Sequence, residues 1–159
     1  MPSRTVSFAR TADTNAYTAN DVIGSATGST AAMRFSGLTA GGGVHRIISS
    51  ALRVDSTAVI SGEANYRVHL HAGPPPSALG DNVAFDIPAG DRASYLGFVD
   101  LGTPVDLGST LYIKSEQAVD FDLPANTDLH GYLVTIGAYT STSARVYAVT
   151  LRAVRVDSN

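Results

Sequence analysis

Apolar and polar residues alternate along most of the chain with a period of two, which is the pattern of β-strands that have one face in a core. In the clearest case Tyr66, Val68 and Leu70 alternate with charged or polar residues. Other segments of this kind, each bounded by turn-forming residues, cover residues 6–8, 17–23, 32–38, 44–54, 96–101, 110–115, 119–123, 129–139 and 145–156. No segment shows an apolar period of 3.6 residues, so the pattern predicts an almost entirely β chain.

The number and spacing of these segments predict how the strands assemble. About nine to eleven short strands in 159 residues predict a single domain over 1–159. Its fold is expected to be an all-β, antiparallel two-sheet β-sandwich, jelly-roll-like, with little or no helix. The last two segments, 129–139 and 145–156, are joined by a short polar connector, which predicts a β-hairpin. The residues expected in the core are Val6, Phe8, Ile47, Tyr66, Val68, Leu70, Leu96, Leu111, Leu133, Ile136, Val149 and Leu151.

Composition and charge exclude several classes of structure and function. Val supplies 15 residues, whereas Glu, Lys, Gln and Met, which favour helices, together supply six. The chain has no cysteine, which excludes disulfides, Cys-ligated metal centres and thiol nucleophiles. Its net charge is −3, and its arginines are spread over several predicted strands without clustering in sequence, so we expect no binding to nucleic acid.

Membrane and secretion signals are also absent from the pattern. No run approaches the roughly 18 apolar residues of a membrane span. The first residues lack the apolar segment of a signal peptide. We therefore expect no membrane partner, and a product that is used inside a cell or released by lysis.

One motif is typical of a metal site. His69 and His71 lie two residues apart on a predicted strand, so they share a face and are able to chelate one ion. The pattern resembles the first cupin motif, but prolines stand where that motif has its glutamate. His45 or His130 would have to supply a third ligand. The favoured interpretation is that His69 and His71 belong to the polar face of a half-buried strand, and no cofactor is expected.

Other catalytic signals are missing. The chain has no Gly-x-Ser-x-Gly elbow. Twelve of its fourteen acidic residues are Asp, mostly in turn-like contexts. The three glycines at 41–43 precede a predicted strand rather than a helix, which excludes a phosphate loop. We therefore assign no catalytic residue and expect that the protein is not an enzyme.

Four short stretches give the chain a family resemblance. They are TNAYTANDVIG at 14–24, YRVHLH at 66–71 with the prolines that follow, DNVAF at 81–85 and YLG at 95–97. Together with the Cys-free, Ser/Thr/Ala/Gly-rich texture, these stretches resemble small structural proteins of tailed-bacteriophage virions. Within that group the chain resembles capsid decoration, or cement, proteins.

This resemblance implies a non-enzymatic virion protein on the outer capsid surface, made in the bacterial host. It would bind the major capsid protein of a phage head, stabilise that head, and act as a homo-oligomer, with a trimer favoured. The segment 2–20 is expected to be either an N-terminal arm or an ordinary edge strand, and the loop 72–91 is long enough to carry contacts. The candidate contact residues in these two segments are Arg4, Phe8, Arg10, Pro74, Pro75 and Pro76.

Other functions stay open at this point. One is a cupin-like enzyme that binds a metal through His69 and His71. Another is a receptor- or carbohydrate-binding module of a phage tail, although the chain has no Trp to display for sugar binding. A head–tail connector or a tail-tube subunit is a further possibility within the virion class.

Overall fold

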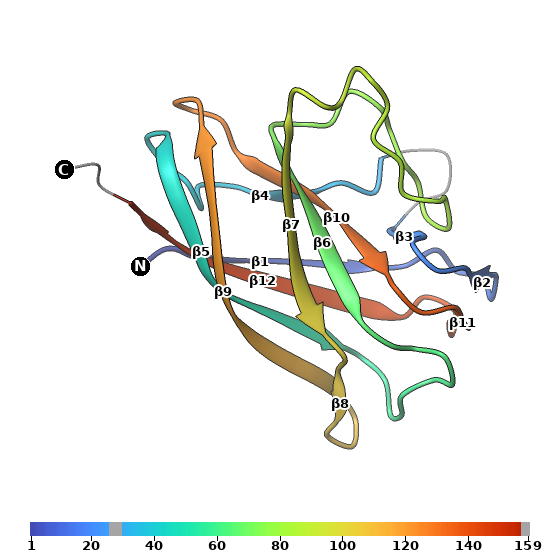
Figure 1. The fold of residues 1–159 in the computed structure, drawn as a ribbon. Helices are drawn as coiled ribbons and strands as arrows, with labels where there is room; N and C mark the ends of the chain where they lie inside the picture. The colour runs from blue at the N-terminus through green and yellow to red at the C-terminus, as the bar shows by residue number, and fades with distance from the viewer. Residues whose placement is uncertain (26–29, 157–159) are drawn as a thin grey trace.

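The computed structural model describes residues 1–25 and 30–156, which form two antiparallel sheets packed face to face (Figure 1). No described residue lies in a helix, so none belongs to a helix that would cross a membrane. The strands are β1 (Ser3–Ala9), β2 (Ala16–Tyr17), β3 (Val22–Ile23), β4 (Met33–Phe35), β5 (Gly43–Val54), β6 (Tyr66–Ala72), β7 (Tyr95–Gly102), β8 (Val105–Asp106), β9 (Leu111–Leu123), β10 (Leu129–Thr135), β11 (Tyr139–Thr140) and β12 (Val146–Arg155).

The strand order confirms the predicted sandwich and its jelly-roll topology. One sheet has the order β1-β12-β5-β9-β8, and the other has the order β3-β10-β6-β7, with β4 also pairing with β10. Strands β11 and β2 form a small separate pair. The four-stranded halves β1-β12-β5-β9 and β4-β10-β6-β7 follow the order of a jelly roll, in which the two sheets share a core.

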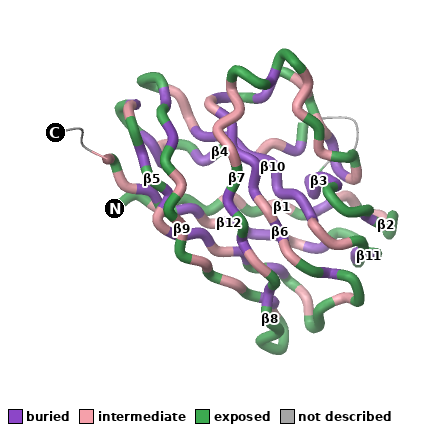
Figure 2. The backbone as a smooth tube through the Cα atoms, in the orientation of Figure 1, coloured by how far each residue is buried: buried purple, intermediate pink, exposed green. Residues whose placement is uncertain are grey.

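The core lies between the two sheets and contains most of the residues expected there. Eight of them are fully buried, namely Ile47, Tyr66, Val68, Leu70, Leu111, Leu133, Val149 and Leu151. Val6, Phe8 and Leu96 are partly buried and pack against this cluster. Ile136 is half-buried. Figure 2 shows β10 buried along its whole length.

The predicted C-terminal hairpin is wrong. β10 pairs with β6 in one sheet, whereas β12 pairs with β1 and β5 in the other. The connector 136–145 crosses from one sheet to the other and carries β11, which pairs with β2. The two segments predicted at 110–115 and 119–123 are a single strand, β9, whose register against β5 shifts between Ile47 and Ser49.

The N-terminal segment takes the edge-strand form. Residues Ser3–Ala9 pair with β12 along their whole length, from Ser3 opposite Arg152 to Ala9 opposite Val146. This pairing places the first strand at the edge of its sheet. Residues 10–25 then pass to the other sheet through β2 and β3.

Candidate functional site

His69 and His71 lie on the outer face of the β10–β6 sheet, beneath the loop 73–94. Across the strand pair His69 lies opposite Tyr132, and His71 lies opposite His130. The loop supplies Leu79 and Phe85 to a small apolar cluster on this face. Because of that cover, His71 is only 1% exposed, so the polar face expected for this strand is covered by the loop rather than open to solvent.

Aromatic rings and hydroxyl groups surround both imidazoles. The ring of Phe85 stacks on His69 with 3.8 Å between centroids, and His69 Nδ1 lies 3.0 Å from the Tyr95 hydroxyl. His71 Nδ1 lies 3.2 Å from Ser94 Oγ, whereas its Nε2 is buried and has no hydrogen-bond partner among the residues that the structure describes. The two histidines therefore fill a covered layer rather than an open site.

Burial also sets the charge of these histidines. Loss of solvent lowers the pKa of His69 to about 4, and the nearby positive charge of Arg67 acts in the same direction. Burial lowers the pKa of His71 as well, although the carboxylate of Asp91 opposes that shift. Both rings are thus neutral near pH 7.

The residues considered for a metal site do not form a complete ligand set. His130 is the cross-strand neighbour of His71, but His45 belongs to the opposite sheet, where its ring stacks on Phe121. Within residues 1–25 and 30–156 no three His, Cys, Asp or Glu side chains are grouped so that they would hold an ion. The cupin-like arrangement is not assembled in this fold.

The loop 73–94 is fastened to the sheet at several points. The backbone N–H of Ser77 donates to the carboxylate of Asp91 at 3.1 Å. The Tyr132 hydroxyl donates to the Ser77 carbonyl at 3.0 Å. Among the prolines proposed as contacts, Pro75 is buried while Pro74 and Pro76 are exposed. Only Pro74 and Pro76 are therefore accessible to a partner.

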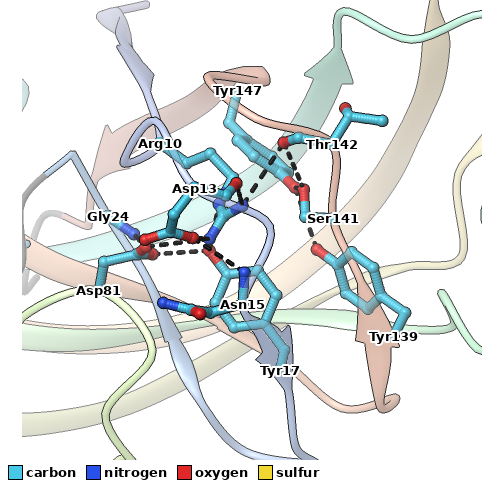
Figure 3. Close-up of polar contacts among 10 residues, drawn as sticks. All are labelled: Arg10, Asp13, Asn15, Tyr17, Gly24, Asp81, Tyr139, Ser141, Thr142 and Tyr147. Carbon is cyan, nitrogen blue, oxygen red and sulfur yellow. Dashed lines mark hydrogen bonds and ion pairs between the residues drawn. The ribbon is translucent and has the colours of Figure 1, made fainter.

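Arg10 is held inside the protein by a polar network (Figure 3). Its Nη2 lies 2.7 Å from Asp13 Oδ1 and 3.3 Å from Asp81 Oδ2, and its Nε donates to the Tyr17 hydroxyl at 2.9 Å. The backbone N–H of Gly24 donates to the same Asp81 carboxylate at 2.9 Å. The Arg10 side chain has no exposed surface. It therefore ties the N-terminal segment to the loop, and the expectation that it contacts a partner is corrected.

The other two N-terminal candidates differ in accessibility. Arg4 is exposed, and its guanidinium donates to the carbonyls of Ser36 at 2.6 Å and Ser3 at 2.9 Å. Phe8 is half-buried, and its ring stacks on Tyr147 with 5.8 Å between centroids. Arg4 is thus available at the surface, whereas Phe8 mainly closes the edge of the core.

A second buried ion pair was not foreseen from the sequence. Arg145 Nη1 lies 2.9 Å from Glu63 Oε1, and neither side chain has exposed surface. The Tyr66 hydroxyl also donates to Glu63 Oε1, and Tyr139 lies 3.1 Å from Tyr66 through their hydroxyls. This cluster joins the 60–66 turn to the connector that crosses between the sheets. It is closed to solvent and therefore to a substrate.

Exposed apolar side chains gather at one end of the sandwich. Val105 is 59% exposed and Leu107 is 64% exposed. Tyr112, which is 38% exposed, lies opposite Val105 across the β8–β9 pair. These three residues are called the β8 tip, and Figure 1 shows β8 projecting at the lower end of the molecule. The indication in the sequence is that two apolar residues, Val105 and Leu107, stand between Pro104 and Gly108 in a stretch otherwise typical of a turn.

Comparison with known proteins finds likeness only among structures. No protein-family model matches the chain, and no curated protein matches its sequence. The chain is similar to the capsid of Ralstonia phage GP4, with 16% identity over 99% of this chain and 86% of that chain and a TM-score of 0.40. It is similar to PRD1 vertex protein P5, with 12% identity over 97% of both chains and a TM-score of 0.36. It is also similar to the carbohydrate-binding module TmCBM27, which recognises mannan, with 12% identity over 79% of this chain and 63% of that chain and a TM-score of 0.36.

Proposed function

We propose that this chain is a non-enzymatic structural protein of a phage virion, and that it acts as a decoration protein on the outside of the head. The observation that supports this best is the β8 tip, where three apolar side chains are exposed on a well-packed sandwich. Large exposed apolar groups that lie together are typical of contact sites between proteins. The resemblance of four sequence stretches to small structural proteins of phage virions, among which the chain is most similar to decoration proteins, supports the same function.

The position of the tip suits attachment to a capsid subunit. β8 is the edge strand of its sheet, so one side of its backbone is free of strand pairing. An extended segment of the major capsid protein is able to pair with such an edge while its side chains cover Val105 and Leu107. This contact is governed by shape and apolar burial. Moderate salt is expected to weaken it only slightly.

Binding of this kind stabilises the head by mass action, because the ligand binds the assembled shell and not its dispersed subunits. A homotrimer at a local threefold position of the capsid would engage several subunits at once and gain avidity. In this proposal the major capsid protein is the partner, and the protein joins the outer capsid surface after synthesis in the bacterial cytoplasm.

The test uses heads that lack the protein. Purified chain is added back, and bound protein and the temperature of thermal rupture are measured. The double variant Val105→Ser with Leu107→Ser removes the two most exposed apolar side chains of the β8 tip. Val59→Ser, which changes an exposed apolar residue in the β5–β6 loop, is the matched control.

The unaltered chain and the Val59→Ser variant should bind and raise the rupture temperature until binding saturates. The double variant should bind at least about tenfold more weakly. Heads that neither bind the unaltered chain nor gain stability would overturn the function. Full binding by the double variant would overturn the assignment of the contact to the β8 tip.

A further inference from the structure

The outer face of the β1-β12-β5-β9 sheet contains a trough of about 450 Å³. This face belongs to the sheet opposite the covered histidines. The strand register places Thr5, Thr150, Ala51 and Lys114 in one row across four strands. All four residues line the trough. The trough is therefore a feature of the regular sheet and not of a loop.

Small side chains form the floor of the trough. Ala148 is 5% exposed and Ser49 is 8% exposed, while Ala51 is half-buried. The hydroxyls of Thr5 and Thr150 lie 2.7 Å apart and bond to each other across the β1–β12 pair. Longer side chains, among them those of the exposed Arg53, Arg152, Lys114 and Tyr112, also line it. Because longer side chains surround the short ones, this face of the sheet is concave.

Two arginines that line this trough have no charged partner among the described residues. Arg34, Arg46 and Arg67 each form an ion pair with an aspartate. In contrast, Arg53 and Arg152 form no hydrogen bond or ion pair through their side chains with any residue that the structure describes.

Among residues 1–25 and 30–156, no carboxylate lines the trough. Lys114 lies 3.4 Å from the exposed Glu116, and Asp55 lines a smaller neighbouring hollow together with Arg53. Although the net charge of the chain is −3, Arg53 and Arg152 thus present two positive charges in a concave site, without a charged partner among the described residues.

The spacing of Arg53 and Arg152 along the sheet favours an extended ligand. Arg53 lies beside Ala148, and Arg152 lies four residues further along β12 on the same face. At about 3.4 Å per residue, the two levels are roughly 14 Å apart along the sheet. A ligand that pairs with each guanidinium group at its own level of the sheet therefore carries at least two anionic groups along its length.

We propose that this trough binds an acidic oligosaccharide, of the kind that contains uronic acids. Guanidinium groups bind carboxylates in paired hydrogen bonds, and serine and threonine hydroxyls match the hydroxyls of sugar rings. Tyr112 at the rim offers an aromatic surface to a sugar. An acidic peptide strand fits less well, because the backbone groups of these strands are already paired within the sheet. This binding activity goes beyond head stabilisation and does not depend on it.

The experiment is a calorimetric titration of the purified chain with hexagalacturonate. Maltohexaose is the neutral probe of equal length, and hexaglutamate is the acidic peptide probe. The variant Arg53→Ala with Arg152→Ala removes both unpaired cations. Arg92→Ala is the matched control, because Arg92 is an exposed arginine outside the trough whose side chain likewise forms no hydrogen bond or ion pair with a described residue.

Hexagalacturonate should bind the unaltered chain and the Arg92→Ala variant with equal affinity, and added salt should weaken both. The double variant should bind it at least about tenfold more weakly, and maltohexaose should bind poorly. Absence of hexagalacturonate binding at millimolar concentration, or full binding by the double variant, would overturn the proposal. Equal or tighter binding of hexaglutamate would also overturn it, in favour of an acidic protein partner.

The two proposals fail independently. The Val105→Ser, Leu107→Ser variant should keep its affinity for hexagalacturonate, and the Arg53→Ala, Arg152→Ala variant should keep its effect on head rupture. The two surfaces meet at Tyr112, which neither variant changes. Loss of both activities in either variant would overturn the assignment of the two contacts to different residues.

Discussion

The phenol of Tyr17 donates a hydrogen bond of 2.6 Å to the carboxylate of Asp81, although the two residues belong to different segments of the chain. Tyr17 lies in β2, and Asp81 lies in the loop that covers the histidines. Burial and the neighbouring carboxylate raise the pKa of Tyr17, so the phenol keeps its proton. Arg10 completes the contact with its own bonds to both residues.

Replacement of Asp81 should therefore destabilise the fold strongly. Asp81→Asn leaves the Arg10 guanidinium buried with only the partly exposed Asp13 as its charged partner. We expect a loss of about 3–5 kcal/mol in the free energy of unfolding. Tyr17→Phe removes two hydrogen bonds, the one donated to Asp81 and the one accepted from Arg10, and should cost about 2–4 kcal/mol. Urea denaturation measures both. Asp122→Asn, at an exposed position on β9, is the control and should change stability by less than about 0.5 kcal/mol.

Acidification should destabilise the protein through the covered histidines. Burial lowers the pKa of His69 to about 4 in the folded state, whereas the unfolded chain has the ordinary value of 6.5. The unfolded state therefore binds the proton first as pH falls. The contribution of the neutral ring to stability is complete above pH 6.5 and is lost progressively toward pH 4. His71 acts in the same direction.

The measurement compares urea midpoints at pH 7.5 and pH 5, a window above most carboxylate titrations. The urea midpoint of the unaltered chain should be lower at pH 5 than at pH 7.5. His69→Gln should lower the midpoint at pH 7.5 but reduce the difference between the two pH values. An equal difference in both proteins would contradict the role of His69.

Two glycines with positive φ should respond differently to substitution. Gly62 has φ 87°, and a Cβ at that position would lie 2.1 Å from the carbonyl oxygen of Ala138. Gly108 has φ 102° and nothing within 4 Å of the corresponding point. Gly108→Ala should cost about 1–2 kcal/mol, from the backbone conformation alone. Gly62→Ala should cost clearly more, because the backbone of the crossing connector must move. Similar thermal midpoints for the two variants would contradict this expectation, because they would show that the backbone of the connector moves at little cost in free energy.

The proposed trimer makes a prediction for the isolated protein. Light scattering should give a mass three times that of the 16.5 kDa chain. A monomer at all accessible concentrations would contradict a preformed trimer. The Val105→Ser, Leu107→Ser variant should keep the trimer if the β8 tip faces the capsid, as we propose.

The fold was predictable because alternation reports directly on which side of a strand meets a core. Tyr66, Val68 and Leu70 are all buried as the pattern requires. The pairing of the strands was harder to predict from the sequence. A short polar connector between 129–139 and 145–156 favours a hairpin locally, yet Tyr139 and Arg145 are drawn inward by partners on other elements.

The candidate sites show the same division between local and distant information. His69 and His71 share a face, as their spacing indicates, but the cover that buries them comes from Phe85 in a loop. Arg53 and Arg152 look scattered in the sequence, and only the β5–β12 register places them on one trough. Sequence separation hides such sites because no local pattern relates residues that are brought together by sheet pairing.

The position of β12 has a consequence for how the protein is made. It is the last strand that the structure describes, yet it lies between β1 and β5 inside its sheet. While a ribosome is still synthesising residues beyond 135, β1 has no partner strand and one edge of β5 stays open. The sandwich therefore closes only after translation has passed Arg155. During that interval the nascent chain exposes strand edges that are prone to aggregation, so it is expected to depend on rapid completion or on chaperones.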